Sequence, residues 1–538
     1  MRAIKQSAAK AQLLLPFHGK ASDAGTGDEM RQVFRKIPVY TGDVSGVCSA
    51  LFELGGMVVM HDPSGCNSTY NTHDEIRWYD HDSLIFISGL NDTDAILGSD
   101  DKLVRDITEA ARIYSPAFIA IANSPIPYVI GMDFDAICRL IEDETGIPAF
   151  YISTNGMHDY TRGAGLAFLE LARRFAGKQR EGGTFEKKTG RGLSENREGT
   201  DDSLKNSGGA AGSLQNRGGA DAAAGDRRIR VNLLGLTPLD FAASSTVNTL
   251  RAIIESAGFE IVSSWAMEGA AAGEERDILP ARDPDRESSD REFSDRKSSD
   301  RESSEMESSD RESSSEGMHN RLLEDICRSS CADVNLLLSS TGLPTAEYMK
   351  KEFGIPFVAG IPAHGVGERY FEAVRAAAAT GENQYPFRDR GDVPADDQKS
   401  PVCLIGEPVV MTSLAASLQT LTGCPTHVFS ATEEGNDKAG DGNQFLGKND
   451  SAPKGEEALN AMLSQIVSEN ASLSGKGIAV AADPCYRDIL PEGCSLVRLP
   501  HLAFSGRIFL KEIPDLVGED VFTAFKSSLS SKKSGYSI

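Results

Sequence analysis

The sequence lacks any apolar run long enough to cross a membrane, and it has fewer basic than acidic residues. A membrane-spanning helix needs about 20 consecutive apolar residues, so we expect no membrane span. The net charge of −24 at pH 7 argues against a nucleic-acid-binding protein, because such proteins need a basic face. The 9 cysteines lack the dense spacing of a secreted disulfide scaffold. These features predict a cytoplasmic protein with reduced thiols.

Two tracts of the chain have almost no apolar residues. Residues 179–228 are rich in glycine, serine, asparagine and charge, and within residues 269–318 the sequence Ser-Ser-Asp-Arg-Glu recurs every 10 residues from Ser288 onward. Such tracts cannot bury enough apolar surface to offset the entropy of ordering, so we expect two disordered insertions. The small and polar residues 1–30 predict a flexible arm.

The rest of the chain alternates short apolar runs with amphipathic stretches, which is typical of an α/β fold whose parallel sheets are covered by helices. We expect strands at 57–60, 84–87, 117–122, 149–152, 230–235, 335–338, 402–406 and 477–482. We expect helices at 102–113, 133–143, 246–257, 321–328, 345–353, 412–421 and 456–468. The predicted α/β domains are residues 31–178, 229–390 and 391–538.

Three segments of the first domain form one recognisable pattern. They are His61-Asp62-Pro63-Ser64-Gly65-Cys66, the run from Ser88 to Gly98, and the run from Asn123 to Asp133. In this order and spacing they resemble the nitrogenase component 1 type oxidoreductases, a family that includes the MoFe protein, the dark protochlorophyllide reductases and the nickel-tetrapyrrole reductive cyclases. The resemblance implies three Rossmann-like units in the chain and an iron–sulfur cluster at a subunit interface.

Cys66 is the best match to a cluster ligand. Gly65 lets the backbone approach a bulky cluster and can donate its amide to a cluster sulfur. By resemblance, the first cysteine position of the family falls near Tyr40 or Thr41, where there is no cysteine. Asp43 is close by and Cys48 lies two turns further on, and the third position falls on Ser124. We expect Cys66 and Cys48 as metal ligands, with Asp43 and Ser124 as poorer candidates. Two cysteines from each of two subunits would complete a [4Fe-4S] site.

Two alternatives remain open for this cluster. Cys48 lies among small and apolar residues, where a buried structural thiol is the simpler interpretation. If Cys66 is then the single ligand from each chain, the cluster is labile or absent.

A second candidate site is implied by the way nitrogen-fixing members hold their large cofactor, through a cysteine and a distant histidine. Ser339 occupies the position of the cysteine, and His501 is the candidate histidine and catalytic residue. A hydroxyl is a poor substitute for a thiolate toward soft metal–sulfur clusters, so we expect no molybdenum–iron cofactor. His61, His158 and His364 are further candidates to line a cleft, although a lone histidine is more often structural.

The resemblance predicts an anaerobic, iron–sulfur-dependent reductase subunit that forms a homodimer or a heteromer with a related component 1 subunit. Its electrons would come from a separate P-loop, ATP-dependent iron–sulfur reductase like the nitrogenase iron protein. This chain lacks a P-loop of its own, because Asn449 follows Gly447-Lys448 where a serine or threonine is required. The substrate would be a small conjugated molecule or a tetrapyrrole. The alternatives are a scaffold or carrier for metal-cofactor assembly and a ligand-binding protein without redox activity.

Overall fold

The computed structural model describes residues 35–37, 41–63, 75–79, 83–98, 100–181, 184–187, 228–242, 244–265, 267, 322–390, 395–396, 398–433, 443–474, 477–523 and 525. The predicted arm at 1–30 and the whole predicted insertion at 269–318 lie outside these residues, as does the segment that contains Gly65 and Cys66. The described part of the chain forms three α/β units.

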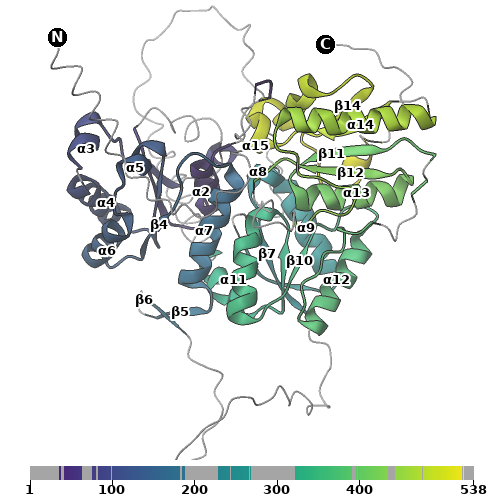
Figure 1. Cartoon of the computed structure of the whole chain (residues 1–538). Helices are drawn as coiled ribbons and strands as arrows, with labels where there is room; N and C mark the ends of the chain where they lie inside the picture. The colour runs from purple at the N-terminus through teal and green to yellow at the C-terminus, as the bar shows by residue number, and fades with distance from the viewer. Residues whose placement is uncertain are drawn as a thin grey trace, which may run out of the picture. The chain divides into compact units, whose positions relative to one another are not determined.

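The first unit contains a parallel sheet with the strand order β2-β1-β3-β4. Its strands are β1 (Met57–His61), β2 (Leu84–Ile87), β3 (Ile119–Asn123) and β4 (Ala149–Ile152). Its helices are α2 (Asp43–Leu51), η2 (Ile76–Tyr79), α3 (Asp92–Leu97), α4 (Asp100–Tyr114), α5 (Pro125–Ile130), α6 (Phe134–Thr145) and α7 (Tyr160–Phe175). Figure 1 shows α4 and α6 side by side, and their apolar residues pack with those of β1 and β3 in one cluster.

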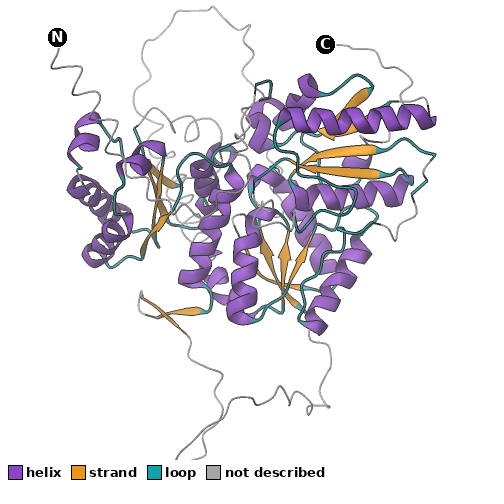
Figure 2. Ribbon diagram, viewed as in Figure 1, coloured by secondary structure: helices purple, strands orange, loops and turns teal. Residues whose placement is uncertain are grey.

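The second unit has the strand order β10-β9-β7-β8, again with parallel pairs. Its strands are β7 (Arg230–Leu234), β8 (Glu260–Ser264), β9 (Val334–Leu337) and β10 (Phe357–Ala359). Its helices are α8 (Pro238–Phe241), α9 (Ser244–Ser256), the helical residues 322–328, η3 (Ser329–Cys331), η4 (Ser340–Gly342), α11 (Leu343–Phe353) and α12 (Gly367–Thr380). Figure 2 shows strands of this sheet with helices on either side.

The third unit has the strand order β12-β11-β13-β14, and all its pairs are parallel. Its strands are β11 (Val402–Gly406), β12 (Thr426–Ser430), β13 (Ile478–Ala482) and β14 (Cys494–Arg498). Its helices are α13 (Pro408–Thr422), α14 (Glu456–Ser474), η5 (Pro484–Ile489), α15 (Leu502–Ser505) and η6 (Gly506–Glu512). None of the described helices has the length and apolar character needed to cross a membrane.

One hydrophobic cluster contains residues from all three units. Phe168 of α7, Trp265 after β8 and Leu414 of α13 belong to it, and each is almost completely buried. The rings of Phe168 and Trp265 meet edge to face with centroids 6.1 Å apart. Because such burial removes much apolar area from water, the three units are held together by a shared core.

Helices α2 and α7 pack unusually closely because glycines lie between them. A Cβ atom on Gly163 of α7 would lie 1.8 Å from the carbonyl oxygen of Asp43, and one on Gly46 of α2 would lie 2.3 Å from the carbonyl oxygen of Tyr160. Real Cβ atoms do not approach a backbone that closely. The two glycines therefore determine the distance between the helices.

The fold prediction is confirmed in class: the chain has three parallel sheets covered by helices. Strands β8, β10, β12 and β14 were not predicted from the sequence. Nor was a short antiparallel hairpin of β5 (Lys178–Glu181) and β6 (Thr184–Lys187) at the start of the tract at 179–228. Residues 188–227 of that tract lie outside the described residues.

Candidate functional site

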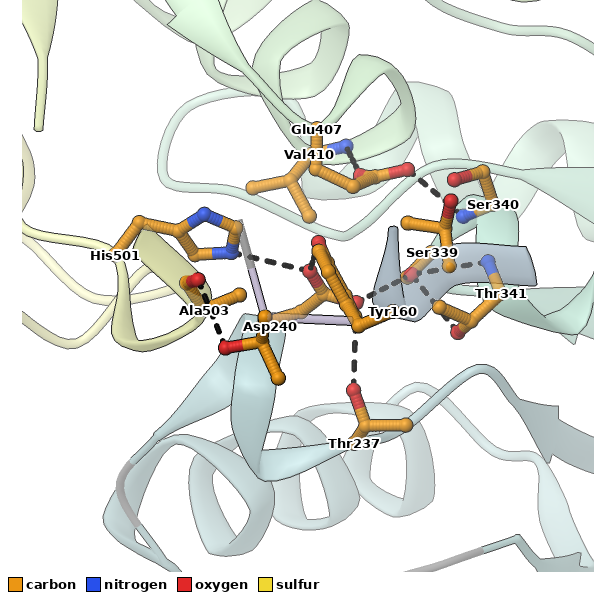
Figure 3. Close-up of polar contacts among 12 residues, drawn as sticks. Tyr160, Thr237, Asp240, Ser339, Ser340, Thr341, Glu407, Val410, His501 and Ala503 are labelled. Atoms are coloured by element: carbon orange, nitrogen blue, oxygen red, sulfur yellow. Dashed lines mark hydrogen bonds and ion pairs between the residues drawn. The ribbon is translucent and has the colours of Figure 1, made fainter. Parts of the chain in front are cut away.

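Buried polar residues from three units meet in one hydrogen-bonded network (Figure 3). Asp240 lies in α8, shortly after β7, and Ser339 follows β9. Glu407 follows β11, and His501 follows β14. All four residues therefore lie beyond the carboxyl ends of parallel strands, where open α/β sheets bind their ligands. Tyr160 at the beginning of α7 adds a side chain from the first unit.

Asp240 is the centre of this network. Its Oδ1 accepts a hydrogen bond of 2.5 Å from the Tyr160 hydroxyl, and its Oδ2 accepts one of 2.6 Å from the Ser339 hydroxyl and a longer one of 3.4 Å from Thr237. The side chain is completely buried. A buried carboxylate needs several donors to offset its lost hydration, and Asp240 has them from two units.

His501 provides the imidazole of the network, a ring with two nitrogens that can each carry a proton. Its Nε2 lies 3.1 Å from Asp240 Oδ1, and its backbone amide donates to Asp483 Oδ2 at 2.8 Å. Its Nδ1 is buried and has no hydrogen-bond partner among the described residues. A carboxylate that binds one ring nitrogen fixes the tautomer of the imidazole and leaves the other nitrogen to exchange a proton. His501 Nδ1 is thus the atom best placed for proton transfer.

Glu407 connects the second and third units through backbone amides. Its Oε1 accepts from Ser340 N at 2.8 Å, and its Oε2 accepts from Val410 N at 2.7 Å, which caps α13. Burial, followed by the nearby Asp240 carboxylate, raises the pKa of Glu407 to about 7. Burial also raises the pKa of Tyr160, and the same two carboxylates add to that effect. The site therefore holds acids whose protons are retained near neutral pH.

Tyr160 is positioned by contacts around the start of α7. Asp159 caps the helix by accepting from Thr161 N at 3.0 Å, and its Oδ2 accepts from Glu433 N in the third unit at 2.7 Å. His158 Nδ1 lies 2.9 Å from Glu433 Oε2. Burial raises the pKa of Asp159 to about 6. These bonds fix the beginning of α7 against the third unit.

Backbone hydrogen bonds around residue 42 join Asp43, one of the candidate cluster residues, to this site. The amide of Asp43 donates to His158 O at 3.0 Å, and the amide of Tyr160 donates to Thr41 O at 2.7 Å. Thr41 in turn donates through its amide and its hydroxyl to Ala503 O, in each case at 3.0 Å. Residues 41–43, 158–160 and 503 thus form one hydrogen-bonded junction.

The structure places the described candidate cluster residues in different surroundings. The carboxylate oxygens of Asp43 accept from the amides of Val44, Asn155 and Gly156 at 2.8–3.2 Å, and burial raises its pKa. The thiol of Cys48 is packed inside the hydrophobic core, where burial and then the nearby Glu75 carboxylate raise its pKa.

The third described candidate, Ser124, is different. Its hydroxyl is buried at the start of α5 without a hydrogen-bond partner among the described residues. It follows β3, whose last residue, Asn123, pairs with His61 of β1. The segment containing Gly65 and Cys66 continues from that end of β1. Ser124 thus lies beside the start of the segment that carries the best-matched cysteine, although Gly65 and Cys66 themselves are outside the described residues.

The other three candidate histidines have separate partners. His61 contacts Ser88 Oγ at 2.8 Å and Met132 Sδ at 3.2 Å, and burial lowers its pKa to about 4. His158 pairs with Glu433, as described above, and His364 is 3.9 Å from Glu519. Of the four candidates, His501 alone is bonded to Asp240 in the described structure.

The donor set of the network does not fit a metal–sulfur cofactor. Ser339, Asp240 and Tyr160 present hard oxygen atoms that are already bonded to one another. Soft metal–sulfur clusters prefer thiolates. Among the described residues, histidine, cysteine and acidic side chains form no group of three that could hold a metal ion. The arrangement instead offers hydroxyl, carboxyl and imidazole groups, which can exchange protons.

Sequence reasoning missed Asp240, Tyr160 and Asp483 as site residues. An acidic residue in the turn after a buried strand was the available signal for Asp240 and for Asp483. No local pattern marks Tyr160, because its partner is 80 positions away.

One known family matches more than half of this chain. Residues 45–383 match the family described as nitrogenase component 1 type oxidoreductase. This match includes Tyr160, Asp240 and Ser339 but ends before Glu407 and His501. Members of the family bind metal–sulfur clusters and form multi-subunit complexes with an iron protein partner.

The relatives found are distant. The nitrogenase iron-molybdenum cofactor biosynthesis protein NifE of Methanococcus maripaludis is 28% identical over 80 residues, which cover 15% of this chain and 17% of that protein. NifE of Klebsiella pneumoniae is 28% identical over 103 residues, 19% of this chain and 22% of that protein. The chain thus aligns with less than a quarter of the length of these curated relatives.

Two solved structures of nitrogenase Cp1 align with 93% of this chain at 13% identity. The structure at pH 6.5 has 73% of its chain covered and a TM-score of 0.43, and the one at pH 5 has 92% covered and a TM-score of 0.48. The family match extends over well over half of the 538 residues. The chain therefore belongs to the nitrogenase component 1 type oxidoreductases.

Proposed function

We propose that this chain is a cytoplasmic reductase subunit that adds electrons and protons to a conjugated small molecule or a tetrapyrrole. Each two-electron reduction of a double bond consumes two electrons and two protons. In its imidazolium form His501 donates a proton from Nδ1 and becomes neutral, while its Nε2–H donates a hydrogen bond to Asp240, which orients the ring. Tyr160 and Ser339 hold Asp240 in place through their hydroxyl groups.

The observation that carries this proposal is the pair formed by His501 Nε2 and Asp240 Oδ1, with the opposite ring nitrogen buried and free of a partner among the described residues. This geometry is that of a general acid held by a carboxylate. Glu407, whose pKa is raised to about 7, is a nearby reservoir for a proton. Neither role requires a metal ligand.

Electrons would be supplied by a P-loop, ATP-dependent iron–sulfur reductase through an iron–sulfur cluster held at Cys66. The cluster would lie between this chain and a second copy or a related component 1 subunit. Two helices that follow β2 and β3, the neighbours of β1 in the sheet, support an interface at this edge. Ile96 of α3 and Val129 of α5 are 81% and 77% exposed, and no residue of α3 is buried. Exposed apolar residues grouped beside a functional segment are typical of a protein contact.

The similarity to NifE favours a second candidate function, that of a scaffold or carrier in metal-cofactor assembly. The oxygen-rich network at Asp240 argues against it, because a carried metal–sulfur cofactor needs softer donors. The two functions predict different activities. A reductase converts its substrate to a product, whereas a scaffold transfers its metal to another protein.

The test uses protein purified without oxygen, a low-potential chemical reductant and a tetrapyrrole whose absorption spectrum reports reduction of the ring. We expect turnover by the parent protein and a loss of about 100-fold or more in His501→Gln, as is usual for removal of a general acid. The control is His427→Gln, because His427 is bonded to a backbone carbonyl away from the network.

Iron content of both variants should equal that of the parent protein. No turnover by the parent, together with transfer of its iron to a metal-free component 1 protein, would establish the scaffold function instead. Equal turnover by the parent and His501→Gln would exclude His501 as the proton donor.

A further inference from the structure

A cavity of about 320 Å³ lies in the second unit, outside the acid network. It is lined by every residue of β8, from Glu260 to Ser264. The rest of its lining comes from Arg230 of β7, Arg251 of α9 and, between 322 and 331, Leu322, Asp325, Arg328 and Cys331. None of these residues takes part in the network at Asp240.

The topology places this cavity along the outer edge of β8. The strand order β10-β9-β7-β8 makes β8 an edge strand. Helix α9 connects β7 to β8, which is a step toward the edge of the sheet, whereas residues 322–328 lie in the connection from β8 back to β9. Because both crossovers are right-handed, these two helices lie on opposite faces of the sheet. A cavity that touches both faces and every residue of the strand must follow its edge.

The edge of a parallel sheet presents backbone amides and carbonyls that another strand can pair with. Five residues of β8 offer a groove about 16 Å long, at about 3.3 Å per residue. Ile261 and Val262 are half-buried in it, which gives apolar contacts beside the polar backbone.

The groove is lined by both basic and acidic side chains, and only some of its arginines form ion pairs. Arg230 pairs with Asp333, and Arg328 pairs with Asp325. Arg251 has no ion pair among the described residues although it lines the cavity. Glu260 is exposed at the start of the strand. An extended ligand with a carboxylate opposite Arg251 would satisfy the unpaired guanidinium.

We propose that this groove binds an extended peptide segment of a partner protein, which adds a strand to the edge of β8 and places an acidic side chain against Arg251. The backbone of the peptide supplies the affinity through strand pairing, and Arg251 selects for the acidic residue.

Cys331 gives a direct measurement, because it is an exposed thiol that lines the groove. The probes are octapeptides of alternating threonine and valine that carry one glutamate, one lysine or neither. The full-length protein is alkylated with iodoacetamide in their presence. The modification of Cys331, and of Cys485 in the third unit, which does not line the groove, is followed by mass spectrometry.

We expect the glutamate peptide to slow alkylation of Cys331 and to leave Cys485 unchanged. Arg251→Ala should weaken that protection about tenfold, the effect of losing about 1.4 kcal/mol. Arg105→Ala, which removes an exposed arginine of the first unit, is the matched control. Methylation of alternate peptide amides should abolish protection.

Three results would overturn the proposal. If no peptide of the series slows the alkylation of Cys331, the edge of β8 is not open to a peptide. Protection unaffected by amide methylation would exclude strand pairing. Protection seen only after deletion of residues 271–316 would assign the groove to this chain's own insertion instead of a partner.

Discussion

Tyr160 and Asp240 are joined by a hydrogen bond of 2.5 Å although they are 80 positions apart in the chain. Tyr160 begins the last long helix of the first unit, and Asp240 lies in the first turn after a strand of the second. Both side chains are almost completely buried. The bond therefore fixes the relative position of two units at the point where the candidate site is formed.

Tyr160→Phe should lower the free energy of unfolding by about 1–2 kcal/mol, because Asp240 loses a donor while the ring remains packed. Tyr370→Phe is the matched control. Tyr370 is equally buried, but its hydroxyl has no partner among the described residues, so its removal should cost nothing. Urea unfolding of both variants measures the difference. Equal losses in the two would mean that the bond to Asp240 contributes nothing measurable.

The stabilisation contributed by Glu407 and Asp159 should be lost as pH rises from about 4 to about 7, whereas His61, whose pKa is lowered to about 4, should add stability as pH rises from about 4 to about 6.5. Glu407 and Asp159 have pKa values raised to about 7 and about 6, so the folded state binds their protons more tightly than the unfolded chain does. That stabilisation is complete below the unfolded pKa values and is lost as pH rises through the folded ones. Urea unfolding at several pH values measures the slope.

Glu407→Gln should remove the share of Glu407, so that the stability of the variant declines less, or rises more, than that of the parent between about pH 4.5 and 7, because glutamine does not titrate. Glu382→Gln changes an exposed glutamate and should leave the slope as it is in the parent. An unchanged slope in Glu407→Gln would show that Glu407 does not carry the pH dependence.

Gly163→Ala should destabilise the protein by about 1–3 kcal/mol, because the added methyl group overlaps the Asp43 carbonyl and forces α2 away from α7. Gly367→Ala adds a methyl group at the start of α12, where the nearest atom is 3.9 Å away. That variant should be as stable as the parent or slightly more so, since alanine favours a helix. Thermal unfolding of the pair tests whether close packing, and not glycine as such, explains the effect.

Cys66→Ala should remove most of the bound iron, because Cys66 is the predicted ligand best matched to the family. Cys48→Ala should instead cost stability and leave iron per chain unchanged, since its thiol is packed in the core with a raised pKa. Cys327→Ala is the control for a buried cysteine of the second unit. Iron analysis of anaerobic protein checks all three. Loss of iron in Cys48→Ala would establish Cys48 as a ligand after all.

Ile96→Glu and Val129→Glu should each shift the protein toward the monomer in sedimentation, if α3 and α5 form the subunit contact that we propose. Ile508→Glu is matched to them in exposure, at 77%, but lies in the third unit. Dissociation by Ile508→Glu alone would locate the contact elsewhere.

The central strands could be predicted from sequence because their signal is local. β1, β3, β11 and β13 are buried along their whole length, and each is a short run of apolar residues. β14 escaped prediction because it is an edge strand in which a single residue, Val497, is buried. A half-exposed strand has no continuous apolar run to identify it.

The site could be predicted only in part for a related reason. His501 and Ser339 were found through resemblance to the family, whereas the residue that joins them was not. Asp240 is 99 positions from Ser339 and 261 from His501. In the sequence, Asp240 is not distinguishable from other polar residues in turns. Its role is visible only in the folded chain, where it contacts Tyr160, Ser339 and His501. Contacts at such separations are decided by packing, which local sequence patterns do not encode.

The junction around residue 42 has a mechanical consequence. Asp43, beside the predicted cluster segment, and Tyr160, in the acid network, are joined by backbone hydrogen bonds between residues 41–43 and 158–160. Neither of these two segments can move without breaking the hydrogen bonds or moving the other segment. A change of charge that displaces the backbone near Asp43 should therefore also displace the backbone at Tyr160, and the reverse. Backbone hydrogen bonds alone would transmit this displacement.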